Sequence, residues 1–71
     1  MIGAKIRAYI KEKGYKQTFI AKAAGISDAA LSDILIHDRR IEVTEYVGIC
    51  LALGVPLDFF VKDIMERKEE S

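Results

Sequence analysis

Residues 17–27 read Gln-Thr-Phe-Ile-Ala-Lys-Ala-Ala-Gly-Ile-Ser, and this stretch decides the fold. It places a small residue, Ala21, inside an expected helix, then a glycine four positions later, an apolar residue and a good helix cap. Two helices that cross steeply through a short turn need this order. Ala21 lets the next helix approach, Gly25 takes the left-handed turn conformation, and Ile26 fills the junction. The stretch therefore predicts two short helices joined by a tight turn, although an ordinary helical hairpin can show the same pattern.

Outward from this stretch, glycines and one proline divide the chain into segments with apolar residues at helical spacing. The expected helices cover about residues 2–13, 17–24, 27–36 and 43–53, and a fifth follows Pro56. The residues expected to face inward are Ile2, Ile6, Tyr9 and Ile10; Phe19 or Ile20, Ala21 and Ala24; Ala30, Leu31, Ile34 and Leu35; Val43, Tyr46, Val47, Cys50 and Leu53; and Leu57, Phe60, Val61, Ile64 and Met65. Strand signals are weak. We therefore predict an all-α domain of five helices, with a charged tail at 66–71 that frays.

The length and composition allow a single small domain over residues 1–71. An apolar fraction of 51% and a charged fraction of 31% are typical of a globular chain and not of a disordered one. One cysteine and one histidine cannot form a disulfide framework or a zinc site, so we expect no metal and no cofactor. The uncharged stretches are too short for a membrane span, and since the first residues lack the pattern of a secretory leader we expect no secretion. These features predict a cytoplasmic protein.

Charge is distributed unevenly, although eleven basic and eleven acidic residues cancel. Six basic side chains against Glu12 alone give residues 1–26 a net charge of +5, whereas the later segments are mildly acidic. Because electric fields act locally, a positive amino-terminal segment can attract a polyanion even when the total charge is zero. The alternative is a solvated helical surface whose asymmetry has no functional meaning.

The sequence resembles the lambda-repressor-like, Cro-type helix–turn–helix family, often called XRE, over roughly residues 2–65. The resemblance is carried by Ile6, Ile10, Gly14, Gln17, the stretch 20–27, Leu31, Ile34, the stretch 52–55, Leu57, Asp58 and Phe60. It implies a compact five-helix lambda-repressor-like bundle that binds double-stranded DNA, usually as a homodimer. It also implies that the third helix, at about 27–36, enters the major groove of an operator half-site.

The outer face of this third helix is the candidate reading surface. Helical geometry turns Asp28, Ala29, Ser32 and Asp33 away from the apolar face, and by resemblance these residues and Ser27 touch base edges. The face departs from the family pattern, since it offers no Arg, Lys, Asn or Gln for a bidentate contact with a purine. Asp28 also has a structural alternative, because the helix dipole stabilises a negative charge in the first turn.

Phosphate contacts are expected on both sides of the third helix. Lys16, Gln17 and Thr18 lie at the amino end of the second expected helix, where free backbone N–H groups attract anions. By resemblance, Gln17 holds a phosphate and can also brace the third helix. Arg39 and Arg40 follow the third helix, where the family usually touches the DNA backbone. The alternative for the two arginines is a solvated pair that balances a neighbouring aspartate.

His37 and Cys50 are the remaining residues with reactive side chains. His37 stands where the family has a glycine, and its candidate role is a contact with a phosphate or with the helix end. Cys50 falls on the inward stripe of the fourth helix with no histidine or aspartate nearby, so we expect a small buried hydrophobe.

Apolar residues near the carboxyl end are candidates for a dimer interface. Phe59 falls off the inward stripe of the last expected helix, and Gly48, Ile49 and Leu51 enlarge the apolar surface of the fourth. Such a surplus in a small domain usually marks a partner, so we expect a twofold homodimer through Leu57 and Phe59. The alternative is that a tight core uses these residues.

These observations favour a sequence-specific transcriptional regulator, acting as a repressor, that binds an inverted-repeat operator as a homodimer and is controlled by concentration, proteolysis or a protein partner. The alternative is a protein-interaction module that keeps the helix–turn–helix shape without reading DNA. Zero net charge, the acidic third helix and the apolar surplus favour that alternative. The sequence shows no nucleophile–base pair, metal site or phosphate-binding loop, so we do not expect an enzyme.

Overall fold

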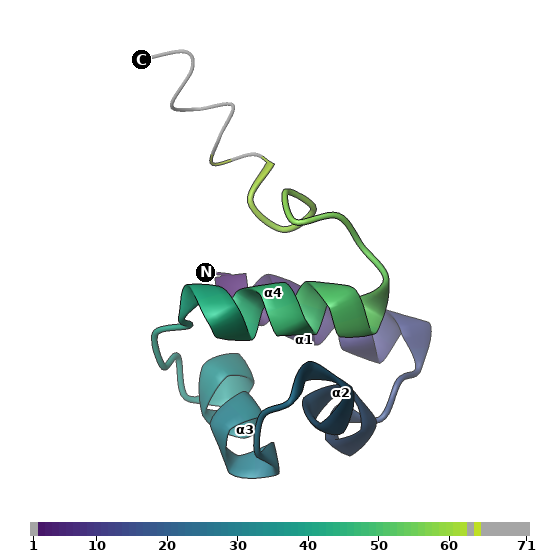
Figure 1. Ribbon diagram of the computed structural model, residues 1–71, viewed down its shortest axis with the longest axis vertical. Helices are drawn as coiled ribbons and strands as arrows, with labels where there is room; N and C mark the ends of the chain where they lie inside the picture. Colours follow the sequence, from purple (N-terminus) through teal and green to yellow (C-terminus); the bar gives the residue numbers. More distant parts are fainter. Residues whose placement is uncertain (1, 63, 65–71) are drawn as a thin grey trace.

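The computed structural model describes residues 2–62 and 64, and within them it has four α-helices and no strand (Figure 1). The helices are α1 (Ile2–Lys13), α2 (Gln17–Ala24), α3 (Asp28–Ile36) and α4 (Val43–Leu53). α2 packs on α3 and α4, and α1 packs on α3. In Figure 1, α2 and α3 lie on one side of α4, and the segment after α4 runs on the other. The all-α class is confirmed, while Met65 and the tail at 66–71 lie outside the described residues.

The turn between α2 and α3 forms as its sequence predicts. Gly25 ends α2 in the left-handed region with φ 78°, and the Ile26 N–H donates to the Ala21 carbonyl over 3.0 Å. Ser27 then caps α3, because its hydroxyl oxygen accepts from the Ala30 N–H over 3.0 Å. Ala21 is fully buried, and Ile26 packs against the core. Backbone and capping hydrogen bonds therefore fix the orientation of α3 relative to α2.

A close backbone contact joins α2 to α4 at Gly48. A methyl group on Gly48 would lie 2.6 Å from the carbonyl oxygen of Ala24, nearer than side-chain carbons approach such an atom. Any side chain here would push the two helices apart. Gly48 therefore serves the packing of two helices rather than an outward apolar surface.

The core gathers apolar side chains from all four helices and from the segment after α4. Its buried members are Ile6, Ile10, Ile20, Ala21, Leu31, Ile34, Leu35, Ile49, Cys50, Leu53 and Phe60. On α3 the buried residues are three of the four that the spacing predicts. Cys50 is a buried free cysteine, and burial raises the pKa of its thiol. A thiol kept protonated is a poor nucleophile, which agrees with the expected packing role.

Two inward assignments are decided by packing rather than by spacing. On α2, Ile20 is fully buried and Phe19 is 61% exposed, which settles the choice between them. On α4, Ile49 is fully buried, whereas Val43 is 78% exposed, so the prediction is wrong for both residues. Because α4 is apolar nearly all round, its spacing does not select one face. Contact with α2 selects it.

The fifth predicted helix does not start directly after Pro56: residues 57–61 form turns, and among the described residues beyond them 62 and 64 are helical. The short-range bonds of these turns are Phe59 N–H to the Pro56 carbonyl over 3.0 Å and Val61 N–H to the Asp58 carbonyl over 3.2 Å. In an α-helix, the Leu57 carbonyl would accept from the Val61 N–H. Here the Tyr46 hydroxyl donates to the Leu57 carbonyl instead. A hydrogen bond from α4 therefore takes the place of a helical one.

Three aromatic rings hold this segment against α1. Tyr9, Phe59 and Phe60 contact one another edge to face. The ring centroids lie 5.2 Å apart in Tyr9–Phe59, 5.7 Å in Tyr9–Phe60 and 5.0 Å in Phe59–Phe60. Phe60 is buried, and Phe59 keeps 46% of its surface exposed. The Lys13 ammonium lies 5.5 Å from the centre of the Tyr9 ring. Phe59, part of the apolar surplus near the carboxyl end, is therefore used in packing within the chain itself.

Candidate nucleic-acid interface

α3 presents a row of solvent-facing side chains opposite its buried face. Asp28, Ala29 and Asp33 are exposed and Ser32 is half-buried, as helical geometry predicts. Ile36 ends the row and is 53% exposed. A carboxylate can accept from cytosine N4, a methyl group can meet a thymine methyl, and a hydroxyl pairs with several base edges. The structure therefore gathers four of the five expected base-contact residues on one face.

Ser27 and Asp28, at the start of α3, also stabilise the helix. The Ser27 oxygen is occupied by a backbone N–H, although its hydroxyl hydrogen remains available to donate. Asp28 lies in the first turn, where a negative charge interacts favourably with the helix dipole. Both residues therefore support α3 independently of any contact with a base.

The amino end of α2 offers backbone donors and a cation. Lys16 precedes the helix in an extended conformation, and its side chain makes no capping hydrogen bond. The first backbone bond of the helix runs from the Ile20 N–H to the Lys16 carbonyl over 3.2 Å. The N–H groups of Gln17, Thr18 and Phe19 consequently have no helical partner. Lys16 and Thr18 are exposed and Gln17 is half-buried, so an anion can reach this helix end.

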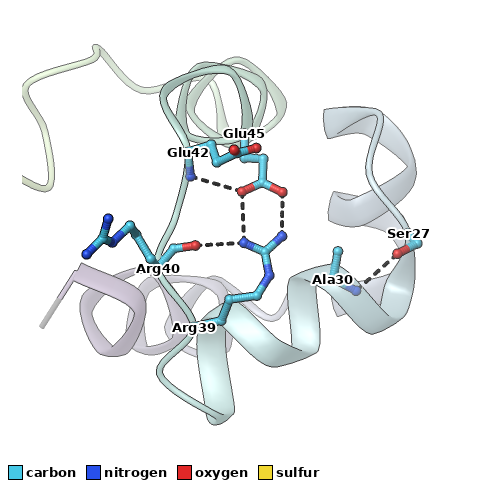
Figure 2. A network of polar contacts seen from close by, with 6 residues as sticks. All are labelled: Ser27, Ala30, Arg39, Arg40, Glu42 and Glu45. Atoms are coloured by element: carbon cyan, nitrogen blue, oxygen red, sulfur yellow. Dashed lines mark hydrogen bonds and ion pairs between the residues drawn. The ribbon is translucent and has the colours of Figure 1, made fainter.

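Arg39 is held by α4 in a bidentate ion pair (Figure 2). Its Nη2 lies 2.6 Å from Glu45 Oε2 and its Nη1 lies 3.2 Å from Oε1, while Nη1 also donates to the Arg40 carbonyl over 2.6 Å. The bond to Glu45 raises the pKa of Arg39. The bond from Arg39, and then the Glu42 N–H that donates to Oε1 over 2.9 Å, lower the pKa of Glu45. A guanidinium expected to hold a phosphate thus ties the α3–α4 loop to the first turn of α4.

The rest of the α3–α4 loop exposes the other expected phosphate contacts. His37 and Arg40 are exposed, and the Arg40 side chain forms no ion pair with another described residue. The left-handed residue after α3 is Asp38, with φ 56°, whereas His37 has φ −101°. The Arg39 N–H donates to the Asp33 carbonyl over 3.0 Å and closes the turn. Asp38 therefore takes the left-handed turn conformation that the family glycine was expected to supply at position 37, one residue later in the chain.

The candidate dimer residues lie apart from this face. Leu57 is 52% exposed, and Phe59 belongs to the aromatic cluster with Tyr9 and Phe60. Both stand on the segment that runs on the far side of α4 from α2 and α3 (Figure 1). A partner bound there would leave the outer face of α3 open.

Sequence reasoning missed two contributors to the candidate interface. Phe19 is exposed in the first turn of α2, beside the proposed anion-binding end; the stripe of Ile20, Ala21 and Ala24 would have excluded it from the core. Glu45 was not linked to Arg39, because six residues and a loop separate them and no periodicity relates the two.

No helix among the described residues is long and apolar enough to cross a membrane. Within residues 2–62 and 64, no three His, Cys, Asp or Glu side chains are grouped to hold a metal ion.

A short α2, a left-handed glycine turn and a capped α3 with an open outer face define a helix–turn–helix domain. The family described as helix-turn-helix matches residues 6–60, and the chain belongs to this XRE-type family, as predicted. The chain is similar to the HTH-type transcriptional regulator SinR of Bacillus subtilis (strain 168), with 31% identity over 71 residues, and to SinR of Bacillus licheniformis, with the same identity. The matches cover all of this chain, which spans 61% of the length of these relatives.

Proposed function

We propose that this chain binds double-stranded DNA as the reading domain of a transcriptional regulator. The observation that carries the proposal is the outer face of α3, which is open to solvent while the Gly25 turn and the Ser27 cap fix its orientation. The uncapped amino end of α2, a helix that packs on α3, suits a phosphate. Membership of the family, and the name transcriptional regulator on both relatives, support the same function.

The proposal gives each expected site residue a role. α3 enters the major groove and reads bases with Ser27, Asp28, Ala29, Ser32 and Asp33. Lys16, Gln17, Thr18, His37 and Arg40 contact the DNA backbone. Arg39 keeps the loop that carries Arg40 in place, since its guanidinium is bound to Glu45. A homodimer through Leu57 and Phe59 places two such faces on an inverted repeat and acts as a repressor in the cytoplasm. With two phosphates neutralised per protomer, by Lys16 and Arg40, the log–log salt slope for the dimer is about −4.

Substitutions on α3 and in the following loop test these roles. Arg40→Ala should weaken binding to every duplex equally and reduce the salt slope by about 1 per protomer. Ser32→Ala or Asp33→Ala should instead change which sequence is preferred. Fluorescence anisotropy with a preferred and a scrambled duplex, over a range of salt concentrations, separates the two effects. A folded protein that binds no duplex would contradict the proposal and favour the protein-interaction alternative, which the acidic α3 face supports.

Glu45→Gln tests whether Arg39 acts through the loop or on DNA directly. If Arg39 holds the loop, the loss of the carboxylate frees Arg40 to move, and affinity falls by a few fold. If Arg39 itself grips a phosphate, removal of its competitor raises affinity. Thr44→Ala, at the exposed neighbouring position, is the control that leaves the ion pair intact.

A further inference from the structure

A small pocket lies between α1, the α1–α2 turn and the carboxyl end of α3. Its volume is about 220 Å³, and its lining residues are Arg7, Ile10, Lys11, Tyr15, Gln17 and Leu35. Ile10 and Leu35 are buried core residues, while Arg7 and Lys11 are exposed. Sites for organic ligands usually measure about 300–1,000 Å³. The pocket therefore suits a small group, not a cofactor.

The polar lining of this pocket is positively charged. Arg7 and Lys11 are one helical turn apart on α1, so their side chains share a face. No acidic residue lines the pocket, and neither side chain forms an ion pair or hydrogen bond with another described residue. Two like charges at this spacing repel each other. An anion bound between them would relieve that repulsion.

Gln17 connects this pocket to the proposed DNA interface. It lines the pocket and is also the first residue of α2, where Lys16 and free N–H groups already suit a phosphate. Tyr15 adds a hydroxyl to the same lining. The pocket therefore extends the anion-binding end of α2 back along α1.

We infer that this pocket receives a backbone phosphate of the DNA duplex, held by Arg7, Lys11 and Gln17. The inference rests on the proposed function and adds two cations on α1 to the expected contacts. A guanidinium can hold a phosphate with two parallel hydrogen bonds, and a lysine adds a mobile point charge. These contacts strengthen binding to any DNA sequence without affecting which sequence is preferred.

The test compares two variants that each lose two positive charges. In Arg7→Gln/Lys11→Gln the pocket loses both cations; in Lys13→Gln/Lys62→Gln it keeps them, since neither of these lysines lines it. Anisotropy titrations with a duplex over a range of salt concentrations should show a salt slope smaller by about 1 to 2 per protomer for the pocket variant. The same loss of affinity should appear for preferred and scrambled duplexes. The control should stay within about twofold of the wild type.

Three outcomes would overturn the inference. A folded pocket variant with the wild-type slope would exclude the pocket, and so would a control variant that loses as much affinity; in both cases the wild type still binds DNA and the proposed function stands. The third uses inorganic phosphate in an NMR titration of the wild type. If phosphate saturably shifts the Arg7 and Lys11 signals while no duplex binds, the pocket is a site for free phosphate and the proposed function fails too.

Discussion

Asp38, two residues after the end of α3, has a φ of 56°, a left-handed backbone conformation that residues other than glycine rarely adopt. A left-handed residue with a Cβ costs roughly 1–2 kcal/mol, and aspartate tolerates the region better than most residues. The conformation persists because the Arg39 N–H must reach the Asp33 carbonyl. The loop that carries Arg40 therefore holds a small amount of backbone strain.

Asp38→Gly should raise the free energy of unfolding by about 0.5 kcal/mol, since glycine removes the strain but gains entropy in the unfolded chain. Asp38→Val should lower it by about 1 kcal/mol, because a branched side chain fits the left-handed region poorly. Urea denaturation of both variants and the wild type measures the difference. A glycine variant less stable than the valine variant would show that φ does not control this turn.

At the scale of elements, α4 determines how the chain continues after Leu53. The Tyr46 hydroxyl donates to the Leu57 carbonyl, so the fixed helix positions the segment that follows it. Burial, and then a hydrogen bond with Cys50, raise the pKa of Tyr46 to about 12. The protonated phenol is therefore part of the folded structure.

This pKa predicts how stability depends on alkaline pH. An unfolded tyrosine titrates near 10, so between about pH 10 and 12 the unfolded chain releases a proton that folded Tyr46 retains. The contribution of Tyr46 is complete below pH 10 and is lost as the pH rises through its folded pKa. The free energy of unfolding should fall more steeply over this range in the wild type than in Tyr46→Phe, as measured by urea denaturation at successive pH values. Parallel curves would contradict the raised pKa of Tyr46 and the burial that causes it.

The elements that local chemistry determines could be predicted from the sequence. Gly25 and Ser27 fix the turn into α3, and the periodicity of α3 separates its core face from the candidate reading face. The turns at 57–61 could not be predicted this way, because a tertiary bond from the Tyr46 hydroxyl to the Leu57 carbonyl accompanies them and no local pattern reveals it. The ion pair of Arg39 with Glu45 could not be predicted either, because it joins a loop to a helix and only the fold brings the two together.

For the whole molecule, the candidate surfaces fall on opposite sides. α2 and α3 lie on one side of α4, and the segment that carries Leu57 and Phe59 runs on the other (Figure 1). A twofold dimer through that segment would leave both α3 helices free to enter adjacent major grooves on one side of a duplex.

Leu57→Asp should convert the proposed dimer to a monomer without unfolding it, because the side chain is half exposed in the protomer and a charge would be buried in the dimer. Sedimentation equilibrium should show the change in mass. Val43→Asp, at an equally apolar and more exposed position, is the matched control and should remain dimeric. A wild type that sediments as a monomer at all concentrations would exclude this interface.

Selection from a random duplex DNA pool at roughly physiological salt tests the central claim most directly, because specific binding is separated there from the electrostatic background. The outer face of α3, doubled by a homodimer, predicts recovery of an inverted repeat with half-sites about one helical turn apart. Recovery of no sequence above background by the folded protein would contradict the claim that α3 reads DNA.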